Sequence, residues 1–286
     1  MYIVQRDRLL KYRSTTFRLN HQHHLKNERD AVRFINDRGF VLFWPGRNIL
    51  LPSVWSATAG DRAVPDNHDD PGHITWRWKD NLLGKKKCYY GRIIHKRNTF
   101  ISLAVLPYFY SLSPNYGDPE SDYLIQYEHG LLPVEAKMIY EVILSKGAMD
   151  TLALKRAAHL SSPINESRFN RSLDILQSDF RILPIGIAEA GSWRYAFIYE
   201  AVHRYFPELI TQSHSISENE ARKNLILIYL KALGACYCND PQRLFRWDVN
   251  ITKQVIEDLI KTNLLTQGKS DDGDQASWII HPDFVI

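Results

Sequence analysis

The sequence lacks the features that would place it in a membrane or outside the cell. No apolar run approaches the roughly 20 residues that a membrane-spanning helix needs, and the N-terminal stretch MYIVQRDRLLKYR carries charges throughout, unlike a secretory signal. Only three cysteines occur among 286 residues, and Cys236-x-Cys238 has no second pair, so neither a disulfide framework nor a zinc site is expected. We therefore expect a reduced, cytoplasmic protein that does not bind a membrane.

The sequence also lacks the short motifs of nucleotide-dependent enzymes and of common hydrolases. No Walker-A loop, dinucleotide-binding fingerprint, G-x-S-x-G elbow or kinase signature occurs in it. These absences argue against nucleotide hydrolysis and against the common hydrolase folds. We expect no cofactor and no bound metal, and the sequence gives no indication of the oligomeric state.

Charge is distributed unevenly along the chain. Hydrophobic residues make up 44% and charged residues 24% of the sequence, ordinary values for a globular protein, and the length suits two or three units of about 100 residues each. Residues 1–100 hold 19 Lys/Arg against 9 Asp/Glu, whereas residues 101–286 hold 17 against 23. The basic first third predicts a polyanionic partner. The alternative is a charged surface that only keeps the protein in solution.

The clearest organisation lies between residues 131 and 210. Apolar residues at helical spacing predict three helices, and the period then changes to that of two strands around a turn at Ala190-Gly191. Three helices followed by a hairpin are typical of a winged helix, in which the third helix reads DNA. Arg168 and Arg171 lie on the outer face of that helix and suit phosphates or base edges. A solvated helix face, or a protein-interaction module, would look similar.

The same order of elements repeats in the last part of the chain, where Ser217 and Glu220 form a capping box. A helix after Asn27 and the buried strand FVLFW end a less regular first block. We predict a mainly α fold with short β-hairpins, of the α+β class, built from tandem winged-helix (helix-turn-helix) units. The expected divisions are a first winged-helix-like unit at 1–60, a basic and aromatic connecting segment at 61–130, a second winged helix at 131–210 and a third at 215–286.

The connecting segment has the most unusual composition. Cations and aromatic residues alternate from His73 to Arg97, and such a pattern suits phosphate neutralisation together with stacking on exposed bases. The alternative interpretation is that the tryptophans form a core and the lysines a solvated loop. With the two arginines of the third helix, the residues predicted to contact DNA phosphates are Arg77, Lys79, Lys85, Lys86, Lys87, Arg92, Arg97, Arg168 and Arg171.

The stretch DRAVPDNHDDPGH, from Asp61 to His73, concentrates carboxylates and imidazoles. Such groups can hold a divalent metal or act as a general base, but no known metal-ligand spacing is present. Asp-Asp-Pro-Gly is also a turn sequence, in which Asp69 or Asp70 caps the next element. We expect the structural role, with catalysis and metal binding as alternatives.

Several short motifs follow one another along the chain, in this order: Gly39-Phe40, WKDNLLGKKKCYYGR, Leu106-Pro107, RYAFIY at 194–199, Phe206-Pro207-Glu208, Ala221-Arg222 and Ala232-Leu233-Gly234. In their order and spacing, over roughly residues 28–265, the sequence resembles the winged-helix crosslink-repair DNA glycosylases (YcaQ/AlkZ-like). It is most similar to a divergent subgroup described only as related to them. The resemblance implies tandem winged helices and a role on alkylated or crosslinked double-stranded DNA.

The resemblance also implies a catalytic Gln-x-Gln or Gln-x-Asp pair on the strand after Gly39-Phe40, and a C-terminal β-barrel. The two catalytic positions fall here on Leu42 and Trp44, neither of which can act as a general base. The sequence after the third predicted unit leaves no room for a barrel, so we expect none. The leading expectation is a protein that binds duplex DNA, damaged DNA included, without the catalytic pair of the family.

Two alternatives stay open. The first is a monofunctional DNA glycosylase with relocated catalytic groups, in which Asp61, Asp66, Asp69 or Asp70 supplies the carboxylate and Trp44 stacks against a lesion. The second is a transcription-associated or protein-interaction scaffold that uses winged helices to bind protein. Release of a free base separates the first alternative from simple DNA binding, and absent or salt-insensitive DNA binding favours the second.

Overall fold

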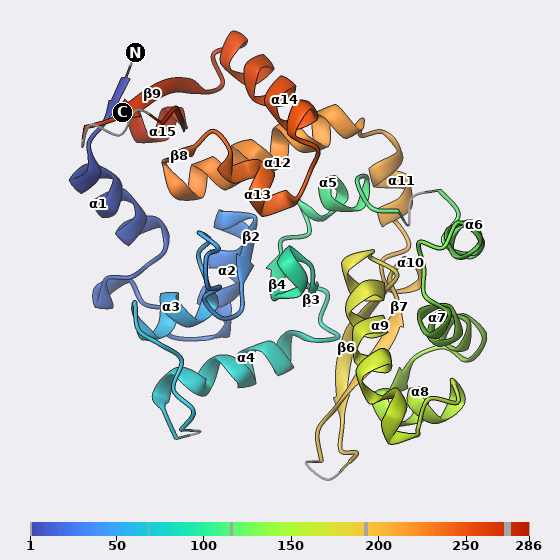
Figure 1. The fold of residues 1–286 in the computed structure, drawn as a ribbon. Coiled ribbons are helices and arrows are strands. Elements are labelled where there is room, and N and C mark those ends of the chain that lie inside the picture. Colours follow the sequence, from blue (N-terminus) through green and yellow to red (C-terminus); the bar gives the residue numbers. More distant parts are fainter. Residues whose placement is uncertain (1, 68, 115–116, 192–193, 272–275, 286) are drawn as a thin grey trace.

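The computed structural model describes residues 2–285 except 68, 115–116, 192–193 and 272–275. In this part of the chain helices predominate, and the strands form three small open sheets of four, three and three strands (Figure 1). The fold is therefore mainly helical α+β, as the sequence predicts. No helix among the described residues is long and apolar enough to cross a membrane.

The middle of the chain contains the short helix α6 and then three helices followed by a hairpin. The elements are α6 (Asp122–Glu128), α7 (Val134–Lys146), β5 (Met149–Asp150), α8 (Thr151–Ala157), α9 (Glu166–Ser178), β6 (Ile182–Ala188) and β7 (Ala196–Ala201). Helix α7 ends at Gly147, whose φ of +78° favours glycine. Asp150 caps α8 by accepting hydrogen bonds from the backbone N–H groups of the first helical turn. Strand β7 pairs with both β5 and β6 in antiparallel fashion.

The last part of the chain shares its sheet with the first residues. Its elements are α12 (Glu218–Leu233), β8 (Ala235–Tyr237), α13 (Asp240–Phe245), α14 (Val249–Lys261), β9 (Thr266–Ser270), β10 (Trp278–Ile280) and α15 (Pro282–Val285), after the short helices α10 (Val202–Tyr205) and α11 (Leu209–His214). Ser217 caps α12 as the capping box predicts. Strand β1 (Tyr2–Val4) pairs in parallel with β9, and Val4 lies opposite Ser270.

Helix α1 (Arg6–Thr16) follows β1 and also packs on the last part of the chain. Arg13 donates hydrogen bonds from Nε to the backbone oxygen of Leu233 (3.1 Å) and from Nη2 to that of Ala235 (2.7 Å). The sequence groups residues 1–60 into one unit, whereas the structure joins β1 and α1 to a sheet and a helix from the other end of the chain (Figure 1). A strand as short as β1 has too few residues for its periodicity to reveal its partner.

The central sheet has the strand order β2-β4-β3. One of its strands precedes residue 60 in the sequence, and the other two follow it. Helix α2 (Glu28–Arg38) leads into β2 (Phe40–Leu42); after α3 (Val54–Ala59) and α4 (Ile74–Leu82), the sheet is completed by β3 (Tyr89–Arg92) and β4 (Asn98–Ile101). Phe40 lies opposite Ile101, and Leu42 lies opposite Thr99. The basic and aromatic segment thus supplies two of the three strands of this sheet. That residues 61–130 form a separate segment connecting two units is still a prediction.

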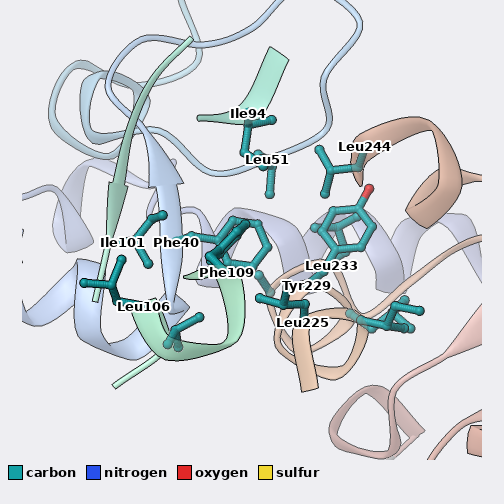
Figure 2. Close-up of a cluster of buried hydrophobic side chains, with 14 of the residues drawn as sticks. Phe40, Leu51, Ile94, Ile101, Leu106, Phe109, Leu225, Tyr229, Leu233 and Leu244 are labelled. Carbon is teal, nitrogen blue, oxygen red and sulfur yellow. The ribbon is translucent and has the colours of Figure 1, made fainter. Parts of the chain in front are cut away.

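The largest hydrophobic core joins the central sheet to the last part of the chain. Phe40 packs against Phe109 of α5 (Leu106–Tyr110), with ring centroids 5.2 Å apart and the rings nearly perpendicular. Figure 2 shows these rings beside Leu225 and Tyr229 of α12. Because one continuous core holds both regions, the β3–β4 turn is positioned by packed elements on two sides.

Candidate nucleic-acid interface

The two positions matched to the family's catalytic pair lie in or beside the core. Leu42 is fully buried, and its backbone N–H donates to the oxygen of Pro52 (3.0 Å) in the loop that follows. Trp44 is half-buried, with ring centroids 5.2 Å from Phe43 and 5.3 Å from Trp76. Its indole nitrogen is buried and has no hydrogen-bond partner among the described residues. Neither side chain presents a titratable group to solvent.

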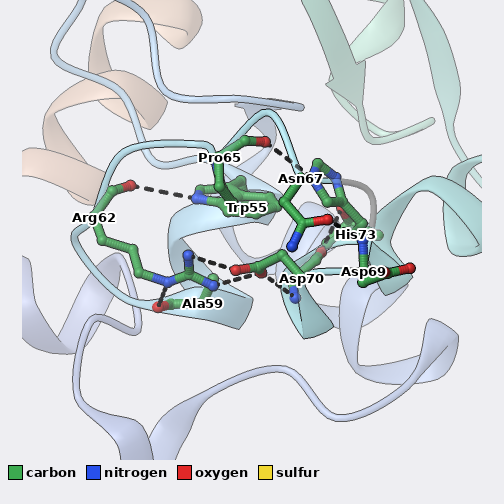
Figure 3. A network of polar contacts seen from close by, with 10 residues as sticks. Trp55, Ala59, Arg62, Pro65, Asn67, Asp69, Asp70 and His73 are labelled. Carbon is green, nitrogen blue, oxygen red and sulfur yellow. Dashed lines mark hydrogen bonds and ion pairs between the residues drawn. The ribbon is translucent and has the colours of Figure 1, made fainter.

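The aspartate-rich loop is organised around Asp70, as Figure 3 shows. Arg62 donates from Nη1 and Nη2 to the two carboxylate oxygens of Asp70 (2.9 and 2.6 Å), and its guanidinium lies 5.2 Å from the ring centroid of Trp55. The backbone N–H of Gly72 donates to the same carboxylate (2.8 Å). Hydrogen bonding by Arg62 lowers the pKa of Asp70. The predicted capping role is confirmed for Asp70, which holds the turn before α4.

The other three aspartates proposed as relocated catalytic groups are exposed. Asp61 and Asp66 point away from the core, and Asp69 follows Asn67, whose side-chain oxygen accepts from the Asp69 backbone N–H (3.1 Å). His73 Nε2 lies 3.1 Å from the backbone oxygen of Pro65. Among the described residues, no group of three or more His, Cys, Asp or Glu side chains is arranged to hold a metal ion.

Lys79 of α4 is buried rather than exposed. Its ammonium nitrogen lies 4.7 Å from the ring centroids of both Trp76 and Phe197, and it donates to the Tyr195 hydroxyl and pairs with Asp80. Burial lowers the pKa of Lys79. Since the residue is only 1% exposed, it cannot reach a phosphate in this conformation, and it instead joins α4 to the start of β7. Its neighbour Arg77 is exposed.

The three lysines between α4 and β3 are all exposed, but they do not act as one patch. Lys85 forms an ion pair with Glu28 (2.8 Å). Lys86 lies over the ring of Tyr205, 4.7 Å from its centroid. Lys87 has no ion pair or ring contact among the described residues. Of the three, Lys87 alone therefore has an ammonium group without an ion-pair or ring partner among the described residues.

A second group of cations surrounds the β3–β4 turn. Arg92 pairs with Asp174 of α9 (2.7 Å), and Arg97 follows the turn with its side chain exposed. His95 and Lys96 both have positive φ, of +50° and +57°. His95 Nε2 lies 3.0 Å from the backbone oxygens of Arg243 and Leu244, at α13. The turn is thus anchored between α9 and α13.

Two further cations belong to this group and were not among the predicted DNA contacts. Lys96 and Arg246 line one cavity of about 270 Å³ beneath the turn, with Trp247 in its wall. Lys96 stands within the basic run and could have been included on charge alone. Arg246 is distant from that run in sequence. Its left-handed φ of +56° at the end of α13 could not be foreseen either, because the residues that usually mark this conformation are glycine and asparagine.

The arginines of α9 differ in their surroundings. Arg168 lies 3.3 Å from Glu135 of α7. Arg171 is exposed, without an ion pair among the described residues, and stands one helical turn before Asp174. We name the cations around the β3–β4 turn the basic seam; its members are Arg92, Lys96, Arg97, Arg171 and Arg246.

Fold and surface together define a mainly helical, multi-sheet protein with a basic seam between packed units. The chain belongs to the AlkZ-related family, whose sequence profile matches residues 25–238. Its structure is similar to that of the Streptomyces sahachiroi DNA glycosylase AlkZ, with a TM-score of 0.62 and 12% sequence identity, over 99% of this chain and 71% of that one. No match was found among curated protein sequences.

Proposed function

We propose that this protein binds double-stranded DNA, damaged DNA included, through the basic seam and through exposed cations outside it, and that it does not excise bases. Family membership and the fold shared with a DNA glycosylase support DNA as the ligand. Of the residues predicted to contact phosphates, we retain Arg77, Lys85, Lys86, Lys87, Arg92, Arg97, Arg168 and Arg171, and we add Lys96 and Arg246. Lys79 is left out because it is buried.

The observation that carries the proposal is a set of cations that form no ion pair among the described residues. Within the described residues, Lys96, Arg97, Arg171 and Arg246 form no ion pair. Lys96 and Arg97 belong to the anchored β3–β4 turn, and Arg246 shares a cavity with Lys96. Arg171 stands one helical turn before Asp174, the partner of Arg92. Like charges that gather on a fixed scaffold repel one another, and phosphates relieve that repulsion while releasing counterions. This arrangement favours binding to the DNA backbone with weak sequence preference.

The absence of excision is proposed from Leu42 and Trp44. Attack on the sugar requires a group that orients or deprotonates water, and the fully buried Leu42 side chain has no polar atom. The aspartates of the 61–70 loop do not form a catalytic site in its place. Asp70 is bound to Arg62, and the other three are exposed.

The test measures binding and base release together. Purified protein is incubated with labelled duplexes, undamaged, alkylated or crosslinked, over a salt series, and abasic product is assayed in the same samples. We expect affinity to fall steeply with salt and no abasic product to form. Abasic product would overturn the proposed lack of excision, and salt-insensitive or absent binding would overturn the proposed ligand.

Charge reversal tests the surface. The triple variant Lys96→Glu, Arg97→Glu and Arg171→Glu is expected to weaken duplex binding and to make the dependence of log K on log[salt] shallower by about one for each phosphate that is no longer bound. Lys85→Glu, Lys86→Glu and Lys87→Glu test the α4–β3 turn in the same assay. The matched control is the triple variant Lys11→Glu, Lys146→Glu and Lys253→Glu, which changes net charge equally at exposed positions elsewhere. Equal losses in seam and control variants would contradict a localised interface.

A further inference from the structure

A cavity of about 430 Å³ lies beside the basic seam, between the central sheet and the second predicted unit. Strands β3 and β4 form one wall, and α9, β7 and the start of α8 form the other. The side chains that matter to its chemistry are Tyr90, Asn98, Gln177, Tyr195, Phe197 and Tyr199. The cavity has the size of known small-ligand sites, and it is distinct from the positions of Leu42 and Trp44, which do not line it.

One side of the cavity is aromatic. Tyr195 directly precedes β7, and Phe197 and Tyr199 lie within it; at every second position, these side chains share one face. Their rings meet edge to face, with centroids 5.6 Å apart for Tyr195 and Phe197 and 6.2 Å for Phe197 and Tyr199. The Lys79 ammonium lies over the rings of Tyr195 and Phe197, and a flat ring can stack on the ring surfaces that line the cavity.

The same cavity contains polar atoms without partners on buried residues. The Tyr90 hydroxyl is buried and forms no hydrogen bond among the described residues. Tyr199, a residue that is 5% exposed, adds a second hydroxyl to the lining. Gln177 is 3% exposed; its Nε2 donates to the backbone oxygen of Leu173 (3.2 Å), which leaves its side-chain oxygen as an acceptor. Buried polar groups are normally paired, so the unpaired Tyr90 hydroxyl, beside the Tyr199 hydroxyl and the Gln177 side-chain oxygen, indicates that a polar ligand or water completes the lining.

The rim adds charge and an amide. Arg92 and Asp174 form their ion pair at the edge of the cavity, and the side chain of Asn98 forms no hydrogen bond among the described residues. Amides and tyrosine hydroxyls both donate and accept. The lining therefore combines ring faces with side chains that donate and accept hydrogen bonds. This combination is complementary to a nucleobase, which has two apolar faces and a polar edge.

We propose that this cavity binds a nucleobase. The base stacks on the β7 aromatic row while its edge bonds to Gln177, Tyr199 and Asn98. It comes either from the DNA strand held by the basic seam, unstacked from its duplex, or from a free nucleoside. The first source rests on the proposed DNA binding, and the second does not.

Two measurements distinguish these sources. Duplexes with 2-aminopurine at a mismatched position report unstacking by increased fluorescence, and saturation-transfer NMR with adenosine, guanosine, cytidine and thymidine reports free nucleoside binding. We expect a fluorescence increase on binding the duplex. The double variant Tyr199→Phe and Gln177→Leu is expected to lose that increase, or to weaken nucleoside binding about tenfold, while the anisotropy of duplex binding stays unchanged.

The matched control is Tyr205→Phe, which removes a tyrosine hydroxyl of a residue that does not line this cavity. If Gln177→Leu does not fold, Tyr199→Phe and Asn98→Ala are measured separately. Duplex binding without a fluorescence increase and without nucleoside binding overturns the nucleobase site and leaves a water-filled cavity beside intact DNA binding. Nucleoside binding without duplex binding overturns the proposed function and supports the cavity with a free ligand.

Discussion

Lys79 stands in a run of cations in the sequence, yet four aromatic rings surround its ammonium in the structure. The spacing contains a clue to this placement, because Thr75, Trp78 and Leu82 are buried on the same face of α4. Composition alone predicts that lysines face water, and a helical wheel of residues 74–82 would place this one inward. The aromatic partners at the start of β7 are remote in sequence and are not visible in that pattern.

Asp179, just after α9, is a half-buried acid whose titration affects stability. Burial raises its pKa from the ordinary 3.8 to about 6, although Arg181 and Lys96 act in the opposite direction. Because the folded-state pKa lies above the unfolded value, the neutral acid is the form that folding favours. Its contribution to stability is complete below about pH 4 and is lost as the pH rises through about 6.

The variant Asp179→Asn removes this titration. At pH 8 we expect its free energy of unfolding to exceed that of the wild type by about 1–3 kcal/mol, and the advantage should disappear below pH 4. Denaturant unfolding at pH 3.5, 5, 6.5 and 8 measures the difference. A gap that stays constant over this range would show that Asp179 ionises as an exposed carboxyl does.

At the scale of elements, short sequence motifs correctly predicted the helix caps and helix ends, which depend on residues close together in the chain. The capping box of α12, the Asp70 cap and the helix end at Gly147 follow from residue types at short spacing. The cavity was not predictable in this way, because its walls come from β3 and β4 on one side and from α9 and β7 on the other. Sequence patterns identify each wall, but the pairing of walls depends on tertiary packing.

The loop before α4 gives a prediction of the same kind. Gly72 packs against the buried ring of Trp55, and a Cβ there would lie 2.7 Å from its Cη2 atom. We expect Gly72→Ala to destabilise the protein by about 1–3 kcal/mol, because a rigid indole within the core cannot move aside. Thermal unfolding measures the effect.

Gly186 in β6 is the control, since a Cβ there meets only an ordinary contact of 3.6 Å with Ile198. Gly186→Ala should change the melting temperature little. Similar losses in both variants would indicate that glycine is needed for its backbone freedom and that the Trp55 contact is unimportant.

For the whole molecule, chain order and spatial order differ. The sequence predicts the helical class and the order of three helices and a hairpin in the middle of the chain. In the structure, two of the sheets contain strands from both sides of the expected unit boundaries. Strand β1 completes the sheet of β9 and β10, and β3 and β4 complete the sheet that begins with β2. Pairings over such separations depend on the closure of long loops, for which short segments give no signal.

The β1 pairing predicts an asymmetry between adjacent residues. Val4 is 1% exposed in a core with Trp278, whereas Ile3 is 61% exposed on the opposite face of the strand. Val4→Ala should lower the opening free energy of β9 and β10 by about 1–2 kcal/mol, and hydrogen exchange of their backbone amides should speed up about tenfold. Ile3→Ala should leave that exchange nearly unchanged. Equal effects of the two changes would mean that β1 packs differently on the sheet.

This strand pairing also has a consequence for biosynthesis. Val4 is made long before its partner Ser270, which lies 266 positions further along the chain. At about 5–20 residues per second, the nascent chain keeps β1 unpaired for some tens of seconds, with Val4 and Leu9 exposed to solvent and to chaperones. The sheet of β1, β9, β10 and β8 can close only after translation of β9 and β10, so β1 stays without its partner strand until then.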